Sequence, residues 1–292
     1  RMLFGSYVTG THQLADNAGC PVLAPELAEF LENVRHRLDG LPVHGENVGG
    51  LRYVVARLSR YTGQKLLVVV TSRDLEGLSE RLFGLDDSVS CFVLHNSSAG
   101  NRILDGEATH LQGPAFIEES SAGSVHRVGP FSFFQVNPVS AERLFEIAIQ
   151  AAGTGSRCVE GYAGVGVLTL PLMTRFASVV ANELNPEAVK ALRNTGAEVE
   201  AGAAEEVLPR LLRSECDAVV LDPPRKGLGA EVATAVAESN AKKVVLLSCD
   251  PSSLVRDLPI LMRRYRVAAV WPVDQFPRTA HVETVTELEA IS

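Results

Sequence analysis

The sequence feature that most constrains the fold is an alternation of apolar runs and helical patterns between residues 137 and 264. Four short apolar segments, each followed by a segment with apolar residues at helical spacing, lie at 158–161, 178–183, 217–221 and 244–248. Strands that alternate with helices form a parallel sheet, because each helix carries the chain back across one face. The sequence therefore predicts a doubly wound, Rossmann-like α/β domain over residues 124–292.

Within this domain the helices are expected at 137–152, 165–175, 186–195, 231–239 and 251–264. The last two apolar segments, 265–273 and 281–288, have no helix between them. Two consecutive strands without a crossover pair antiparallel, so we expect this pair at one edge of the sheet.

Residues 1–123 follow a different pattern and are expected to form a smaller, mainly antiparallel α+β domain. Residues 25–38 have apolar side chains at helical spacing, and Gly40 follows as a stop signal. Segments 52–60 and 65–70, separated by a Thr-Gly pair, predict a β-hairpin. Further short strands are expected at 88–94 and 102–104.

Composition limits the class of protein. Of the 292 residues 46% are hydrophobic and 21% charged, and the net charge is −8, which disfavours nonspecific adhesion to nucleic acid but permits a local basic patch. No apolar run approaches the 18 residues of a membrane span, so no membrane partner is expected. Five scattered cysteines indicate a reducing, cytoplasmic setting rather than a disulfide framework. No obligate protein partner is evident.

Cys249 follows the buried strand 244–248 and precedes a helix that begins near Pro251. This position is the carboxyl end of a parallel strand, where open α/β folds bind ligands. A thiol next to a helix amino terminus is also expected to ionise more readily. Position alone supports an inert, buried cysteine equally well.

A glycine-rich loop, Gly161-Tyr162-Ala163-Gly164-Val165-Gly166, follows the first strand of the predicted sheet, and Glu183 ends the next strand. Glycines allow a ligand to approach the backbone closely, and an acid at this place can accept hydrogen bonds from ribose hydroxyls. The pair predicts a nucleoside-containing cofactor, either S-adenosylmethionine or a nicotinamide. Glu183 could instead cap the following helix, which begins after Asn185.

Asp222 follows the predicted strand 217–221 and is itself followed by Pro223-Pro224. Tandem prolines cannot continue a central strand, so the chain leaves the sheet with Asp222 at its rim. In the usual strand order Asp222 and Cys249 lie on adjacent strand ends. A carboxylate and a thiol that converge on one cleft indicate chemistry rather than packing.

Five segments that follow one another in this sequence closely resemble the RNA (uracil-5)-methyltransferases that use S-adenosylmethionine. They are residues 131–137, 160–166, 221–227, 248–258 and 274–283. The similarity extends to Thr11-His12-Gln13, Cys20-Pro21 and residues 51–71, and so covers nearly the whole chain. It implies a class I methyltransferase domain. The Phe-Phe-Gln-Val-Asn motif is more similar to the 23S ribosomal RNA branch than to the bacterial tRNA branch.

The resemblance also implies roles for individual residues. Cys249 would be the nucleophile that adds to uracil C6, Glu283 the general base that removes the C5 proton, and Asp222 a group that binds the uracil edge. The cofactor-binding positions correspond to Gln135, Tyr162, Gly164, Glu183 and Asp222. Phe133 and Arg278 would contact the RNA substrate. The target uridine would be unstacked, because a buried thiol cannot reach a stacked base.

The sequence departs from the family pattern in several places. The glycine loop keeps only the glycines and the aromatic residue, and Val167 occupies a position that is often polar. Many relatives hold a four-iron cluster through three upstream cysteines and one that matches Cys20, the only one present here. Either the cluster-binding segment precedes Arg1 or this member lacks the cluster, since one cysteine cannot hold it. The small β-barrel domain of many relatives is also missing from this chain.

Alternatives to uracil methylation at ribosomal RNA remain. The same chemistry on the T-loop uridine of tRNA is the nearest of them. A cytosine-5 methyltransferase would carry a Pro-Cys motif, which Asp222-Pro223-Pro224 lacks. An amino-group methyltransferase needs an aromatic residue where Arg225 stands. A noncatalytic RNA-binding protein with this fold would not need Cys249, Asp222 and Glu283 together.

Overall fold

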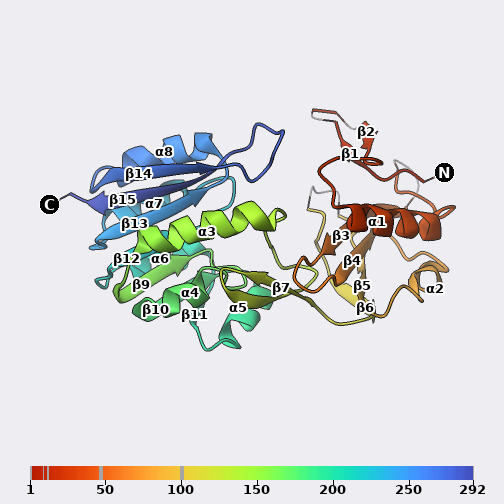
Figure 1. Cartoon of the computed structure of the whole chain (residues 1–292), viewed down its shortest axis with the longest axis horizontal. Coiled ribbons are helices and arrows are strands. Elements are labelled where there is room, and N and C mark those ends of the chain that lie inside the picture. The colour runs from red at the N-terminus through yellow and green to blue at the C-terminus, as the bar shows by residue number, and fades with distance from the viewer. Residues whose placement is uncertain (1, 9, 12, 46–48, 99–101, 292) are drawn as a thin grey trace. The chain divides into compact units, whose positions relative to one another are not determined.

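The computed structural model describes residues 2–8, 10–11, 13–45, 49–98 and 102–291. The chain divides into two compact units, Arg1–Glu119 with Val128–Phe131, and Ser120–Arg127 with Ser132–Ser292. The predicted boundary between residues 123 and 124 falls in the turn that follows strand β7 (Ile117–Ser121; labelled in Figure 1) and precedes strand β8 (Ser124–Val128). His12, part of the resemblance noted above, lies outside the described residues.

The first unit contains a four-stranded sheet in the order β3-β4-β5-β6. Its strands are β3 (Leu51–Leu58), β4 (Lys65–Thr71), β5 (Val89–His95) and β6 (Ala108–Gln112). The predicted β3–β4 hairpin is confirmed, and the sheet is mainly antiparallel, with β4 and β5 parallel. Also present are the short strands β1 (Gly5–Tyr7) and β2 (Leu14–Asp16), and helices α1 (Pro25–Leu38) and α2 (Leu78–Leu82). Helix α1 has the predicted bounds.

The second unit is built on a seven-stranded sheet in the order β11-β10-β9-β12-β13-β15-β14. The strands are β9 (Gly155–Gly161), β10 (Phe176–Glu183), β11 (Glu198–Ala201), β12 (Ala218–Leu221), β13 (Lys243–Ser248), β14 (Tyr265–Val273) and β15 (Glu283–Ala290). The first five are parallel, and β15 pairs antiparallel with both β13 and β14. The predicted Rossmann-like α/β fold with an antiparallel pair at its edge is confirmed.

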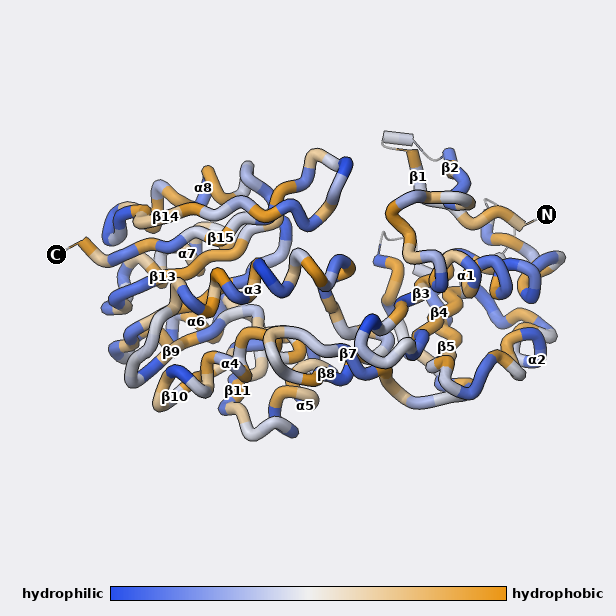
Figure 2. The backbone as a smooth tube through the Cα atoms, viewed as in Figure 1, coloured by the Kyte–Doolittle hydropathy of each residue, from blue (hydrophilic) through white to orange (hydrophobic). Residues whose placement is uncertain are grey.

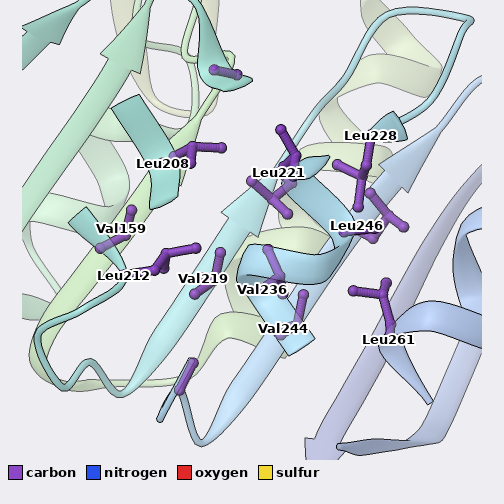
Figure 3. Packing of buried hydrophobic residues seen from close by; sticks show 14 of the residues in the cluster. Val159, Leu208, Leu212, Val219, Leu221, Leu228, Val236, Val244, Leu246 and Leu261 are labelled. Carbon is purple, nitrogen blue, oxygen red and sulfur yellow. The ribbon is translucent and has the colours of Figure 1, made fainter. Parts of the chain in front are cut away.

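Helices cover both faces of this sheet. They are α3 (Pro138–Ala152), α4 (Thr169–Met173), α5 (Pro186–Arg193), α6 (Ala204–Leu211), α7 (Gly229–Ala237) and α8 (Pro251–Leu261). Alternate residues of β12 and β13 point to opposite faces: Val219 and Val244 pack with α6, α7 and α8 (Figure 3), whereas Val220 and Val245 pack with α3 and α4. Strands buried on both faces read as continuous apolar runs, which is why they were predictable.

Helix α3 covers its face of the sheet with one apolar side. Leu144, Ile147 and Ala148 are buried at helical spacing, and hydrophilic residues alternate with them along the tube in Figure 2. In the part of the chain that the structure describes, no helix has the length and apolar character needed to cross a membrane.

Some expectations were wrong. Residues 102–104 are not a strand; the chain bends there and pairs only from Ala108 onward. The helix expected at 165–175 is limited to Thr169–Met173, because Gly164 and Gly166 adopt positive φ and hold residues 165–168 in turns. Strand β11 and helix α6 were not predicted, since β11 is only four residues long and carries two glutamates.

Candidate active site

The residues singled out from the sequence follow one edge of the sheet in the second unit. Strands β10, β9, β12 and β13 are parallel neighbours, so their carboxyl ends lie at this edge in that order. Strand β15 runs antiparallel to β13 and begins at the same edge. The edge therefore presents, in order, Glu183, the glycine loop, Asp222, Cys249 and Glu283. At about 4.8 Å per strand the row spans about 20 Å.

Cys249 and Glu283 are brought together by the register of β13 and β15. Ser248 pairs with Thr284, so the next position along the ladder places Cys249 beside Glu283. The Thr284 hydroxyl donates to the Ser248 carbonyl oxygen at 3.4 Å. Cys249 is half-buried and Glu283 is buried. A thiol and a carboxylate therefore share one partly shielded position at the sheet edge.

The electrostatics around Cys249 differ from the expectation. Burial raises the pKa of the Cys249 thiol, and the Glu283 and Asp222 carboxylates raise it further, whereas the Arg225 guanidinium lowers it. The predicted activation by the amino terminus of α8 does not prevail, because burial and the two carboxylates outweigh it. At neutral pH the thiol is therefore the favoured form of Cys249.

The carboxyl groups along the edge are also shifted. Burial raises the pKa of Glu283 to about 7, that of Asp222 to about 6 and that of Glu160 to about 8. Glu160, at the end of β9, is 2% exposed, and among the described residues its Oε2 atom has no hydrogen-bond partner. Within the same described part no ion pair joins Glu160, Glu183 or Asp222 to a basic side chain. Such a site favours a cationic ligand over an anionic one.

Glu183 and the glycine loop are linked directly. The Glu183 Oε2 atom accepts from the Gly164 N–H at 2.7 Å, and Oε1 accepts from the N–H groups of Leu184 and Asn185 at 2.8 and 2.6 Å. Asn185, not Glu183, caps helix α5. A carboxylate has about four acceptor positions, so about one remains on Glu183 for a ribose hydroxyl.

Tyr162 and Gly164 shape the loop through their backbones. Tyr162 adopts a φ of 63° and Gly164 one of 57°, which is the left-handed region. A non-glycine residue in this region indicates a constraint imposed by the surrounding fold. The Tyr162 ring packs against the core cluster around Leu208, and burial raises the pKa of its hydroxyl.

Gln135 lies half-buried in the segment that precedes α3, and the Phe133 side chain beside it is 70% exposed. Gln135 is tied to the loop before Glu283, because Gln275 Nε2 donates to its Oε1 atom at 3.2 Å. Ser132, at the other end of the segment, donates to Glu187 of α5 at 2.8 Å. The fold thus holds this segment against both the Glu183 side and the Glu283 side of the edge.

Arg278 lies exposed in the loop between β14 and β15, with a φ of 67°. Several of the basic residues near it in the sequence are engaged in contacts within the second unit. Arg266 is paired with Glu289, and Arg256 and Arg264 donate to the carbonyl oxygens of Lys226 and Ile291. Arg256, Arg264 and Arg266 therefore stabilise the fold through these contacts.

Three residues near the edge were not identified as functional candidates from the sequence. Arg225 is the cationic side chain that acts on both Cys249 and Glu283. Glu160 was expected only as part of the loop, although an acid at the end of a buried strand was a readable signal. Gln275 left no such signal, because its partners Gln135 and Asn137 lie about 140 positions away.

The sequence of this chain is similar to one family profile and to several RNA methyltransferases. The family profile described as tRNA (Uracil-5-)-methyltransferase matches residues 209–291. An uncharacterized RNA methyltransferase of Thermosynechococcus vestitus is 34% identical over 305 residues, covering 97% of this chain and 67% of that protein. One of Listeria innocua is 33% identical, covering 98% and 67%. The chain belongs to the RNA (uracil-5)-methyltransferase family.

A solved structure of similar fold is the tRNA (uracil-54, C5)-methyltransferase of Pyrococcus abyssi in complex with S-adenosyl-L-homocysteine. It has a TM-score of 0.77 and 26% identity, covering 94% of this chain and 70% of that one. Trm5b of Pyrococcus abyssi, at 12% identity and a TM-score of 0.51, is similar in fold alone. The present chain spans about two thirds of the length of its curated relatives in the family.

Metal binding has no structural support within the residues described. No group of three His, Cys, Asp or Glu side chains in that part of the chain could hold an ion. Cys20 is half-buried and does not form a disulfide.

Proposed function

We propose that this protein transfers a methyl group from S-adenosylmethionine to C5 of a uridine in RNA, through a covalent bond between Cys249 and uracil C6. The observation that carries the proposal is the register that places Cys249 beside Glu283, next to Asp222 on the neighbouring strand. A nucleophile and a base at one point are what C5 methylation of a pyrimidine needs.

The residues present fit S-adenosylmethionine. Its sulfonium and ammonium groups are cationic. They match the carboxyl groups of Glu160, Glu183 and Asp222, which form no ion pair with the described basic residues, better than the pyrophosphate of a nicotinamide cofactor would. The remaining acceptor position of Glu183 suits a ribose hydroxyl. Gln135, Gly164 and the Tyr162 backbone border the same place. When bound, the cofactor supplies an electrophilic methyl group.

The side chains then divide the chemistry. The Cys249 thiolate adds to C6, and the electron pair of the C5=C6 bond moves onto the ring as an enolate, so that C5 becomes nucleophilic. Asp222 binds the uracil edge and holds the ring in place. After C5 is methylated, the Glu283 carboxylate takes the C5 proton. The C5=C6 bond re-forms and the thiolate leaves, which regenerates the enzyme.

The substrate proposed first is 23S ribosomal RNA, because the amino-acid sequence of residues 133–137 is more similar to that branch of the family. Transfer RNA is the second candidate, since the matching family profile and the similar solved structure are both named for tRNA. Phe133 and Arg278 are exposed near the edge and would contact an unstacked uridine and its phosphates. Methylation of 23S and tRNA transcripts, mapped by mass spectrometry, separates the two.

The proposal is tested by tritium release from RNA labelled at uracil C5. The native protein should release tritium and methylate the RNA, and Cys249→Ala should do neither while it still binds S-adenosylhomocysteine. Cys216→Ala is the matched control, because that thiol is buried in the core away from the edge. Tritium release by Cys249→Ala at the native rate would refute the covalent route.

A further inference from the structure

The segment that carries Phe133 and Gln135 is held at both ends by partly buried hydrogen bonds. At one end the Ser132 hydroxyl donates to Glu187 at 2.8 Å. At the other end Asn137 Nδ2 donates to the main-chain oxygen of Gln275 at 3.2 Å. Gln275 lies in the loop that leads from β14 to Glu283. A single residue therefore connects the cofactor-side segment to the loop of the proposed base.

The side chain of Gln275 makes two further hydrogen bonds to this segment. Its Nε2 atom donates to the main-chain oxygen of Asn137 and to Oε1 of Gln135, both at 3.2 Å. The residue is 1% exposed, so water cannot replace either partner. Its own Oε1 atom is buried and has no partner among the described residues. The arrangement leaves one acceptor unsatisfied in order to use both donors.

The main-chain oxygen of Asn137 fixes the orientation of two amides in series. A carbonyl oxygen can only accept, so the amide group of Gln275 must turn its NH₂ toward it. The second N–H of that NH₂ then faces Gln135 and requires an acceptor there, which orients Gln135 with Oε1 toward Gln275. The NH₂ of Gln135 is consequently directed away from Gln275, and among the described residues no hydrogen bond engages either of its N–H groups.

We propose that Gln275 is a positioning residue that makes Gln135 a hydrogen-bond donor to the α-carboxylate of the bound cofactor. This inference rests on the proposed function. The α-carboxylate is the one anionic group of S-adenosylmethionine, and the row of acids from Glu183 to Asp222 would repel it. A fixed amide NH₂ on the adjoining segment supplies the donor that this group needs.

The test compares two ligands with two substitutions. S-adenosylhomocysteine carries the α-carboxylate, whereas 5′-methylthioadenosine lacks the whole amino-acid end. Gln275→Glu places a carboxylate against Gln135, so the Gln135 amide turns its NH₂ inward and presents oxygen to the ligand. We expect a loss of affinity for S-adenosylhomocysteine of more than about 10-fold, and less than about 2-fold for 5′-methylthioadenosine. Isothermal titration calorimetry measures both.

Gln275→Met removes the two N–H donors without adding charge. The Gln135 amide then loses its fixed orientation but is not turned to the opposite one. The loss for S-adenosylhomocysteine should then be about 3- to 5-fold, which keeps the inference testable if Gln275→Glu fails to fold. The same two substitutions at the exposed Gln150 of α3 are the matched controls and should change neither affinity. In a Gln135→Ala background, Gln275→Glu should add no further loss.

The outcomes are distinct. Equal losses for the two ligands, no loss for S-adenosylhomocysteine, or a full additional loss in the Gln135→Ala background would each overturn the role of Gln275. If the native protein binds neither ligand, the proposed function fails instead. Selective loss of affinity for the ligand with the carboxylate supports the inference.

Discussion

Glu283 is the side chain whose replacement separates two steps of the proposed reaction. A glutamine at this position is isosteric but cannot take the C5 proton, so the adduct between Cys249 and the methylated uracil should form and persist. We predict that Glu283→Gln accumulates an RNA–protein complex that survives denaturing gel electrophoresis, with turnover reduced at least about 100-fold. The double variant Cys249→Ala/Glu283→Gln should give no such complex. Absence of the complex from the single variant would argue against Glu283 as the base.

Arg225 lowers the pKa of both groups that the proposed reaction needs in their deprotonated form, so we predict that it shifts the pH at which the protein becomes active. Its charge lowers the pKa of both Cys249 and Glu283, while burial raises both, that of Glu283 to about 7. The reaction requires the deprotonated thiol and carboxylate, so kcat/KM should rise with pH through this region. Arg225→Gln raises both pKa values and should move the rising limb to higher pH, with a rate at pH 7 up to about 10-fold lower.

The pH profile of Arg225→Lys is the control for this effect. A lysine keeps the charge, so its rising limb should stay near that of the native protein. Because Arg225 is exposed, salt screens its charge and should narrow the difference between Arg225→Gln and the native protein. If Arg225→Gln lowers kcat/KM at every pH without moving the rising limb of the profile, an electrostatic role of Arg225 would be contradicted.

At the scale of elements, the loop between β12 and α7 is held by helix α8. Asp257 of α8 is buried, and its Oδ2 atom accepts from the N–H of Leu228 at 2.7 Å. A Cβ atom at Gly227, which has a φ of 75°, would come within 2.4 Å of that oxygen, so glycine is required there. The helix that begins after Cys249 thus positions the loop that carries Asp222 and Arg225.

Removal of this anchor should destabilise the protein and loosen the loop. We predict that Asp257→Ala lowers the free energy of unfolding by about 2 kcal/mol, because the Leu228 N–H is left buried without an acceptor. Asp257→Asn keeps an oxygen for that N–H and should recover most of the loss. Urea unfolding measures both variants. An equal loss in the two would mean that charge, rather than the hydrogen bond, holds the loop.

The sequence alone was sufficient to predict those elements that depend on a pattern of neighbouring residues. The buried strands β12 and β13 are continuous apolar runs, and the residues after them, Asp222 and Cys249, were placed on adjacent strand ends correctly. The position of β15 between β13 and β14 was not predicted, because it depends on long-range pairing of the last strand with β13. Hence the proximity of Cys249 to Glu283 could be inferred only from family resemblance.

Long-range electrostatics were the other part that local patterns could not supply. The expectation of an activated thiol used only the helix that follows Cys249. The pKa of that thiol depends more on burial and on Glu283, Asp222 and Arg225, which come from other strands and loops. A single sequence position therefore predicts the element on which a residue lies better than it predicts the residue's charge state.

At the scale of the whole molecule, each of the two units has a core of its own. Phe30, Val34 and Leu67 belong to a cluster within the first unit, whereas the clusters of the second unit are built around its seven-stranded sheet. Units with separate cores can open independently. All residues proposed to bind the cofactor lie in the second unit, so ligand binding should stabilise that unit selectively.

Hydrogen exchange with and without S-adenosylhomocysteine tests this. A ligand at 100 times its Kd adds about 2.7 kcal/mol to the free energy of every opening that destroys its binding site. Amides that exchange through such openings, in β9, β10, β12 and β13, should therefore exchange about 100-fold more slowly. Amides of β3, β4 and β5 should exchange at unchanged rates. 5′-Methylthioadenosine at the same multiple of its Kd should give the same pattern, except for weaker protection of residues 132–137. Equal protection of β3 to β5 would show that the two units open as one, or that the ligand binds elsewhere.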